Sequence, residues 1–350
     1  MQTNLSAQEF AGKLLGIYTG GVLTKLIDIG CQTGLFEASV EGAATSDELA
    51  ARAGLDERYV REWLGAMTTS GIFLYDAASG RYRLPQEHAA SLTGAAARNV
   101  SPMSGIIDHF GKHLPRLVKC FREGGGIPYS EYRPEFTCHM DATWRRIYDE
   151  LLISGFLGRI SGLTERLAAG IGVLDVGCGS GHAVNVMARE FPRSHFVGYD
   201  LAEDAIADGR TEASRMGLAN VRFDVLDVAK LPSSPRFALI TAFDAIHDQL
   251  DPATVLARIN AALEDDGTFL MIDFKFASDV AGNIGNPFAP LYYGISLMHC
   301  MTVSLAYGGA GLGAVWGIEK AKAMLADAGF RRVEVLDSPR PQNCIYVCRK

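Results

Sequence analysis

The stretch Gly172-Val-Leu-Asp-Val-Gly-Cys-Gly-Ser-Gly181 decides how the chain folds. A short apolar run that leads directly into three alternate glycines predicts a buried strand feeding a tight turn. Glycines in such a turn permit positive φ angles and let the main chain approach a ligand closely. Residues 182–190 have the pattern of a helix whose amino end would face the bound molecule. The sequence therefore predicts a ligand site at this turn.

A second apolar segment, residues 194–200, ends in the carboxylate of Asp200. A carboxylate about 20 residues past a glycine turn is where a nucleotide cofactor places its ribose hydroxyls. The dinucleotide fingerprint needs a further glycine three positions after the second one, and His182 stands there. NAD and FAD are therefore disfavoured as cofactors.

The same residues resemble motif I of the class I S-adenosylmethionine (SAM) dependent methyltransferases. The cofactor-binding residues that this resemblance implies are Asp175, Gly177, Gly179, Gly181, Asp200, Leu201, Asp227, Val228 and Phe243. In the family, the match of Asp200 binds the ribose, and the glycine turn passes the methionine part of SAM. The match of Leu201 packs on the adenine. Asp227 and Val228 would lie by the adenine amino group, and Phe243 beside the cofactor.

Strand and helix patterns continue to alternate after Asp200. The segments expected are helices at 202–216 and 252–263 and strands at 221–227, 237–243 and 267–273. Alternation predicts a parallel sheet, and a closing helix that ends at Gly329 precedes two terminal strands. The expected fold class is α/β, with a Rossmann-like class I methyltransferase sheet and an N-terminal helical and winged-helix dimerisation domain.

The first hundred residues predict that smaller domain. Residues 8–35 form a helix with several apolar faces, which needs a partner, either the chain's own core or the same helix of a second subunit. We favour the second subunit. Thr45 and Glu48 form a capping box, and Asp56 begins the next helix. A hairpin pattern over residues 72–84 completes a winged helix-turn-helix.

Charge argues against nucleic acid as a partner. Residues 1–100 carry 8 Lys and Arg against 11 Asp and Glu, which is a poor phosphate-binding surface. The whole chain has a net charge of −7 and a pI near 5.7. The longest apolar stretch, Leu291 to Tyr307, is interrupted by polar residues and falls short of a bilayer span, so no membrane contact is expected. It is interpreted as a pocket-lining helix.

The order of domains resembles the two-domain small-molecule methyltransferases of the plant O-methyltransferase and hydroxyindole O-methyltransferase type. It also resembles a bacterial branch of such proteins labelled transcriptional regulators. The division expected is a winged-helix dimerisation domain over residues 1–100, a helical bridge over 101–165 that contributes to the pocket, and a SAM-binding domain over 166–350. An insertion at about 277–316 is expected as a lid. The resemblance implies a homodimer and a small-molecule acceptor.

An aromatic stripe precedes the cofactor domain. Phe136, Met140, Trp144 and Tyr148 follow one another at intervals of four, which places them on one helical face. Most such stripes belong to a core. In the resembled families the corresponding helix covers the SAM site and touches the substrate, which implies that Met140, Trp144 and Tyr148 line the acceptor pocket.

The segment 244–251 carries the candidate base. It matches the His-Asp-x-x-Asp stretch of plant-type O-methyltransferases, in which the position of His247 is the general base. Asp273 matches a residue that orients this base, and Glu319 is a weaker match for a second one. The family's aromatic residue after His-Asp is Gln249 here, so His247 could instead only pack beside the cofactor.

The cysteines add no site to this interpretation. Seven of them are scattered without a paired framework, and the amino terminus lacks the features of a signal peptide, so a reducing cytoplasm is expected. No metal site is predicted. The sequence thus favours SAM-dependent O-methylation of a small, partly hydrophobic molecule. The alternatives are a methyltransferase with a sulfur or nitrogen acceptor and a SAM-binding winged-helix transcriptional regulator.

Overall fold

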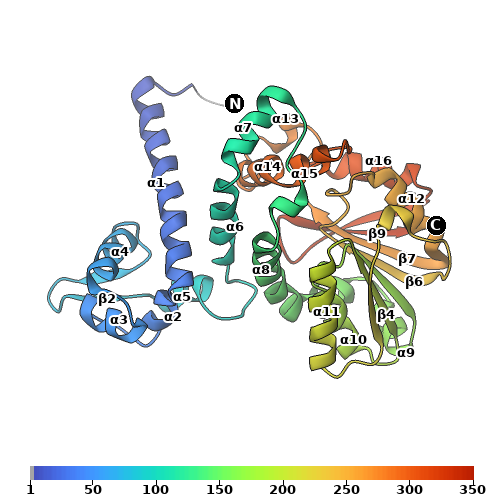
Figure 1. Ribbon diagram of the computed structural model, residues 1–350, viewed down its shortest axis with the longest axis horizontal. Helices are drawn as coiled ribbons and strands as arrows, with labels where there is room; N and C mark the ends of the chain where they lie inside the picture. The colour runs from blue at the N-terminus through green and yellow to red at the C-terminus, as the bar shows by residue number, and fades with distance from the viewer. Residues whose placement is uncertain (1–3) are drawn as a thin grey trace. The chain divides into compact units, whose positions relative to one another are not determined.

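The computed structural model describes residues 4–350 and divides the chain into two compact units, one ending at Gly111 and the other beginning at Lys112 (Figure 1). The elements of unit 1 are α1 (Ala7–Gln32), α2 (Leu35–Ser39), α3 (Ser46–Ala53), α4 (Glu57–Thr69), β1 (Leu74–Asp76), β2 (Arg81–Arg83), α5 (Gln86–Leu92) and α6 (Pro102–Gly111). The division falls beyond residue 100 because α6 packs on α1, where Asp108 pairs with Lys25. Residues 101–111 therefore belong to unit 1, not to a separate bridge.

Local hydrogen bonds form the winged helix as its sequence predicts. The Glu48 amide donates to Thr45 Oγ1 at 3.3 Å, and Glu48 Oε2 accepts from the Thr45 amide at 3.0 Å. Asp56 Oδ1 accepts from the Arg58 amide at 3.0 Å and so begins α4. β1 pairs antiparallel with β2 as the wing. These bonds satisfy amides that would otherwise lack partners at the helix starts.

Aromatic packing holds unit 1 together. The ring of Trp63 lies 5.2 Å from that of Phe36 and 5.5 Å from that of Phe73, and all three side chains are buried. Trp63 Nε1 also donates to the Leu26 carbonyl at 2.8 Å, which ties α4 to the second half of α1. The first half of α1 has no such attachment and exposes Leu15, Ile17 and Tyr18.

One helix of the described residues, α1, is long and apolar enough to cross a membrane by length and composition. An 18-residue window of this helix has a mean hydropathy of 1.3, and 11% of that window is buried. Its second half is part of the unit 1 core, where Leu23, Leu26 and Ile27 pack. The free part, residues 7–22, is about 24 Å long at 1.5 Å per residue, and the hydrocarbon core of a bilayer is about 30 Å thick. A protein partner suits this free part better than a bilayer.

Unit 2 is built on one seven-stranded sheet in the order β5-β4-β3-β6-β7-β9-β8 (Figure 1). Its strands are β3 (Gly172–Val176), β4 (His195–Asp200), β5 (Val221–Val225), β6 (Phe237–Phe243), β7 (Leu263–Phe274), β8 (Arg332–Asp337) and β9 (Asn343–Arg349). β3 to β7 pair in parallel, whereas β9 is antiparallel to β7 and to β8. The predicted class I sheet with its terminal hairpin is confirmed.

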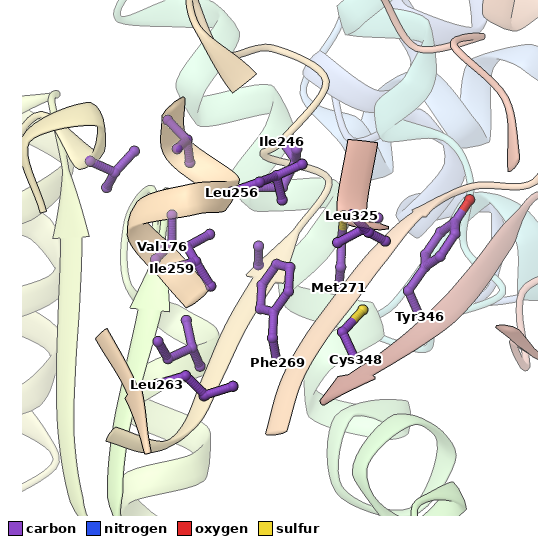
Figure 2. Close-up of a cluster of buried hydrophobic side chains, with 14 of the residues drawn as sticks. Val176, Ile246, Leu256, Ile259, Leu263, Phe269, Met271, Leu325, Tyr346 and Cys348 are labelled. Atoms are coloured by element: carbon purple, nitrogen blue, oxygen red, sulfur yellow. The ribbon is translucent and has the colours of Figure 1, made fainter. Parts of the chain in front are cut away.

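Helices cover the sheet and the edge where its parallel strands end. They are α7 (Leu114–Glu123), α8 (Glu135–Leu151), α9 (Leu163–Ala169), α10 (His182–Glu190), α11 (Glu203–Arg215), α12 (Pro252–Ala262), α13 (Val280–Asn283), α14 (Ala289–Met298), α15 (Cys300–Ala306) and α16 (Ile318–Asp327). Figure 2 shows the core between the sheet and α12 and α16, where Leu256 and Leu325 meet Phe269, Met271 and Tyr346. β6 is buried along its whole length, as its almost wholly apolar sequence predicts.

Several predicted elements differ from those observed, among them the strand expected over 267–273, which begins at Leu263. The helix expected over Leu291 to Tyr307 breaks at His299, whose φ and ψ of −140° and −78° separate α14 from α15. The His299 ring stacks on Phe136 of α8 with 3.8 Å between centroids, so a tertiary contact accompanies the break. The strand expected to reach Asp227 ends at Val225, because Asp227 instead caps the short 3-10 turn that follows.

We expect the Gly30→Ala variant to lower the free energy of unfolding of unit 1 by about 1–3 kcal/mol, the usual cost of overpacking. A Cβ at Gly30 would lie 2.6 Å from the Phe36 ring and 2.7 Å from the Trp63 ring. Gly65→Ala in α4 is the matched control, since a Cβ there meets nothing within 4 Å. That variant should be neutral or stabilising by up to about 1 kcal/mol. Urea unfolding followed by circular dichroism measures both, and equal effects would contradict the packing described.

Candidate active site

The glycine turn after β3 has the backbone that its sequence predicts. Gly177, Gly179 and Gly181 have φ angles of 70°, 53° and 72°, a region that side chains other than glycine rarely adopt. A Cβ on Gly177 would lie 2.7 Å from Ala245, and one on Gly181 would lie 2.4 Å from the Phe223 ring. A Cβ on Gly179 meets nothing within 4 Å. Gly177 and Gly181 therefore allow close packing of their neighbours, whereas Gly179 borders open space.

Asp200, at the end of β4, is joined to this turn. Its Oδ2 accepts from the Gly179 amide at 2.9 Å, and its Oδ1 accepts from the Ala202 amide at 2.8 Å. Burial raises the pKa of Asp200, and these amides partly offset the rise. Each carboxylate oxygen keeps a further lone pair for a hydroxyl donor. Leu201, the next residue, is 64% exposed and lies free to cover a ligand.

The other residues expected near the cofactor lie around the same edge. Asp175 is buried and accepts from Thr241 Oγ1 at 2.6 Å, and burial raises its pKa to about 7. Asp227 accepts from the Ala229 amide at 3.0 Å. The Val228 side chain is 4% exposed and belongs to the core, so only its main chain is left to meet a ligand. Cofactor contacts by these residues stay predictions.

His247 and Asp273 form a buried pair. His247 Nδ1 lies 2.9 Å from Asp273 Oδ1, and the two residues are 2% and 0% exposed. They meet because His247 follows β6 and Asp273 lies near the end of β7, and the two strands are parallel neighbours. Burial alone would lower the pKa of His247, but the charges of Asp273 and Asp248 outweigh it and raise that pKa well above its ordinary value of 6.5. The imidazole is therefore a strong, oriented base.

Cys300 is a neighbour of His247 that the sequence does not predict. His247 Nε2, a carboxylate oxygen of Asp248 and Cys300 Sγ all lie within 4.8 Å of one another, a set of atoms that could hold a metal ion. Only a thiolate is a good metal ligand, and burial raises the pKa of Cys300 to about 12. The prediction that the chain has no metal site remains a prediction.

The aromatic side chains along α8 contact two different groups of residues. Trp144 stacks on Tyr148 at 5.2 Å between centroids, and Tyr148 meets Phe243 at the end of β6 at 5.4 Å. Phe136 instead stacks on His299 of the insertion. Met140, which lies between them on α8, is half-buried. Trp144 and Tyr148 thus approach the edge that carries the glycine turn, and the acceptor contacts of all three remain predictions.

The insertion adds a second aromatic group next to His247. Its helices share a buried cluster with the end of β7, in which Phe274 lies 4.5 Å from Tyr292 and 5.2 Å from the His247 ring. Glu319 is not part of this group. It is exposed, and its Oε2 accepts from the Ser278 amide at 2.8 Å. The interpretation of Glu319 as a charge at a helix start therefore fits its position.

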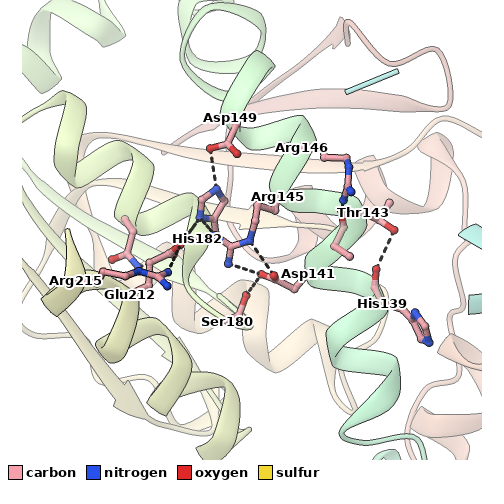
Figure 3. Close-up of polar contacts among 12 residues, drawn as sticks. His139, Asp141, Thr143, Arg145, Arg146, Asp149, Ser180, His182, Glu212 and Arg215 are labelled. Atoms are coloured by element: carbon pink, nitrogen blue, oxygen red, sulfur yellow. Dashed lines mark hydrogen bonds and ion pairs between the residues drawn. The ribbon is translucent and has the colours of Figure 1, made fainter. Parts of the chain in front are cut away.

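A polar network joins α8 to the glycine turn and to α10 and α11 (Figure 3). Asp141 accepts from Ser180 of the turn, and Arg145 pairs with Asp141 and with Glu212 of α11. His182 Nδ1 lies 3.0 Å from Glu212 Oε2. Sequence analysis noted His182 only as a missing glycine. The polar residue at the first position of α10 was the one sequence feature that could have indicated this network.

Glu212 is the centre of this network. Its side chain is buried, and burial alone would raise its pKa, but hydrogen bonds from His182, Asn185 and Arg145 lower that pKa to about 2. The carboxylate therefore stays charged in the folded chain. Because Arg145 and Asp141 belong to α8, the network holds α8 against the turn that would bind the cofactor.

Comparison with known proteins identifies two domains in the chain. Residues 21–94 match the model of an Rv2258c-like winged HTH domain, and residues 167–329 match that of a methyltransferase domain. The chain combines a winged helix-turn-helix domain with a methyltransferase domain. The resemblance to winged-helix methyltransferases and the α/β fold class, both predicted from the sequence, are confirmed.

Curated relatives match the chain over different lengths. The 3-hydroxy-5-methyl-1-naphthoate 3-O-methyltransferase of Streptomyces sahachiroi is 27% identical over 292 residues, which cover 77% of this chain and 79% of that protein. The malonyl-[acyl-carrier protein] O-methyltransferase of Bacillus cereus is 30% identical over 33% of this chain, and the chain spans 42% of its length. The polyketide synthase ThaQ of Burkholderia thailandensis is 31% identical over 33% of this chain, and the chain spans only 6% of that protein.

Solved structures share the fold of the whole chain. A putative O-methyltransferase from Nostoc punctiforme has a TM-score of 0.76 at 19% identity, with 99% of this chain and 100% of that one covered. Human N-acetylserotonin methyltransferase in complex with SAM has a TM-score of 0.70 at 17% identity, with 100% and 99% covered. The arrangement of a winged helix before a methyltransferase domain is thus shared with both.

We expect Glu212→Gln to lower the free energy of unfolding at pH 7 by about 1–3 kcal/mol, because it removes the charge that Arg145 and His182 bind. The folded pKa of Glu212 is about 2, below its ordinary 4.5, so its stabilisation is present above pH 4.5 and is lost as pH falls through about 2. The difference between wild type and variant should therefore shrink between these pH values. Urea unfolding at several pH values measures it.

Asp208→Asn is the control, since Asp208 is exposed on the same helix. It should change stability by less than about 0.5 kcal/mol at each pH. A Glu212→Gln difference that stayed constant down to pH 2 would contradict the charged network.

Proposed function

We propose that the chain is a SAM-dependent methyltransferase that methylates a hydroxyl of a small, partly hydrophobic acceptor. The observation that carries the proposal is a buried histidine-carboxylate pair, His247 with Asp273, at the same sheet edge as a glycine turn bordered by Asp200. A relative similar over most of the chain is named as an O-methyltransferase of a hydroxynaphthoate, which supports oxygen as the acceptor atom.

The residues at the turn suit SAM. Asp200 has lone pairs for two ribose hydroxyls, and the space beside Gly179 lets an amino-acid group approach the main chain. Neighbours of the same fold were solved with SAM or with S-adenosylhomocysteine (SAH), which supports this cofactor. When bound, SAM supplies a methyl group on a positively charged sulfur.

His247 would then remove the acceptor's proton. Asp273 holds Nδ1, so the proton would be taken up at Nε2. The raised pKa makes the imidazole a stronger base, but it also keeps the imidazole protonated to a higher pH. Turnover should therefore rise with pH as His247 loses its proton. Aromatic side chains at this sheet edge, Phe274 beside His247 and Tyr148 beside Phe243, would exclude water and contact an apolar acceptor.

Unit 1 is proposed to form a homodimer through α1. Three glycines at intervals of four, Gly12, Gly16 and Gly20, lie on one side of its exposed half, and a Cβ on any of them meets nothing within 4 Å. Glycine inside a helix costs roughly 0.5–1 kcal/mol relative to alanine, and no packing within the chain offsets that cost. A groove of about 430 Å³ between α1 and α4 adjoins them, lined by Leu15, Val22 and other apolar groups. Close approach of a second α1 would account for these features.

DNA binding is not proposed for the winged helix. On α4, Arg58 pairs with Glu62 at 2.6 Å and Arg61 with Glu57 at 3.4 Å, so its arginines are neutralised by their own helix.

The seven cysteines are all free, which supports the cytoplasm as the compartment. The acceptor atom would be sulfur or nitrogen only if no base were needed.

We expect His247→Ala to reduce turnover by about 10²- to 10⁴-fold, the usual contribution of a general base, while SAH affinity is unchanged. Asp200→Ala should instead weaken SAH binding about 10- to 100-fold, because hydrogen bonds to a charged group are lost. Calorimetry with SAH and rates on a panel of phenols, amines and thiols measure the two effects. His195→Ala is the control, because His195 is exposed at the amino end of β4. Unchanged turnover in His247→Ala would point to a sulfur or amine acceptor.

We expect Gly16→Leu to convert a dimer into a monomer, because leucine would block the close approach of a second α1. Leucine forms helices better than glycine, so α1 itself should not weaken. Light scattering after size exclusion measures the mass. Ala207→Leu, exposed on α11, adds similar bulk elsewhere and should leave the dimer intact. A monomeric wild type would rule the dimer out.

A further inference from the structure

The turn between β8 and β9 reaches the candidate active site because of how the terminal hairpin pairs. β9 runs antiparallel to β7, and Asn343 at its start lies opposite Phe274 at the end of β7. The turn residues 338–342, Ser-Pro-Arg-Pro-Gln, therefore lie at the edge where the parallel strands end. Asn343 Nδ2 donates to Asp244 Oδ1 at 3.1 Å, and Asp244 lies three residues before His247. This turn is the part of the hairpin that can contribute to the acceptor region.

The turn holds the Arg340 side chain against the aromatic stripe. The guanidinium carbon lies 4.7 Å from the centroid of the Trp144 ring, a cation–π contact. The Arg340 amide donates to Ser338 Oγ at 3.1 Å, and the Arg340 carbonyl accepts from the Asn343 amide at 3.0 Å. Prolines on both sides of Arg340 restrict the backbone further. The guanidinium is therefore placed by the fold.

Arg340 has no carboxylate partner. Among residues 4–350, no Asp or Glu oxygen lies within 4.0 Å of its guanidinium, whereas Arg133, Arg145 and Arg210 each have such a pair. Its neighbour in the turn is an amide: the Gln342 oxygen can accept from Arg340 Nη2 at 2.6 Å and from Nε at 3.1 Å. The outer N–H groups of the fork remain for another acceptor.

The nearby acidic group does not neutralise this charge. Burial, together with the charge of Asp273, raises the pKa of Asp244 to about 8, so its carboxyl group is largely protonated near neutral pH. A guanidinium group is a cation in proteins. The acceptor region therefore combines aromatic side chains, one histidine base and one unpaired cation.

We propose that Arg340 binds a carboxylate on the methyl acceptor, so that the acceptor is a hydroxylated aromatic acid. The inference rests on the proposed function and adds the class of substrate to it. The aromatic rings of Trp144 and Tyr148 would contact the acceptor ring, the ring hydroxyl would face His247, and the planar guanidinium would receive the carboxylate. A carboxylate forms charge-assisted hydrogen bonds with a guanidinium, whereas a neutral group in the same place forms weaker ones.

The test compares hydroxybenzoates and hydroxynaphthoates with the carboxamides of the same compounds, using the full chain loaded with SAH. Calorimetry should show that the wild type binds at least one acid about 10- to 100-fold more tightly than its amide, as expected for charged hydrogen bonds. Arg340→Met should lose this preference by weakening the acid alone. Arg332→Met is the matched control, because Arg332 is exposed at the far end of β8 and its loss changes the net charge equally.

Each result is decisive. Equal binding of acids and amides by the wild type, or a preference that survives in Arg340→Met, would overturn the inference while SAH binding leaves the proposed function standing. If SAH did not bind at all, the proposed function would fail, and titrating the same acids into the cofactor-free chain would still test Arg340. Arg340→Lys, which keeps the charge but not the planar fork, should retain part of the preference. Tighter binding of aryl phosphates than of carboxylates would also overturn the assignment.

Discussion

The parallel pairing of β3 with β4 and β6, and of β6 with β7, is the constraint on which the rest of unit 2 depends. Parallel strands all end at one edge, so the residues that follow them meet there even when they are far apart in sequence. The glycine turn follows β3, Asp200 ends β4, and His247 comes soon after β6. This register alone brings the glycine turn next to the Asp200 carboxylate, and it brings His247 next to the Asp273 carboxylate.

Low exposure then decides the chemistry of these groups. Asp175, Asp200 and Asp244 are all buried deeply enough that their pKa values rise, whereas Glu212 keeps its charge because three donors surround it. The same burial makes the His247 pair strong, because charges interact more in a site that excludes water. The polar network of Glu212 lies on the α10 and α11 side of the turn and has a mechanical role: it joins α8, which carries the aromatic stripe, to the cofactor turn (Figure 3).

Much of the site was predictable because its residues belong to local patterns. A strand followed by alternate glycines, and a capping box before an apolar helix, are short-range signals whose physical causes lie within about ten residues. Asp273 was found because it matches a residue of the resembled family and lies near the end of a predicted strand. Cys300 and Arg340 were missed because each comes from a segment whose position depends on the fold of other segments. The single helix expected over 291–307 failed for a similar reason, since Phe136 packs on His299 at its break.

The sequence by itself determined the order of the elements, the α/β class, the winged helix and the identity of the turn, because hydrophobic period, glycine and capping residues act locally. The tertiary structure decided which side chains lie next to one another. It placed Cys300 beside His247, divided the stripe of α8 between two neighbours, and left Arg340 against Trp144 without a carboxylate. Those outcomes depend on strand register and on packing between distant segments, and neither has a periodic signal in the chain.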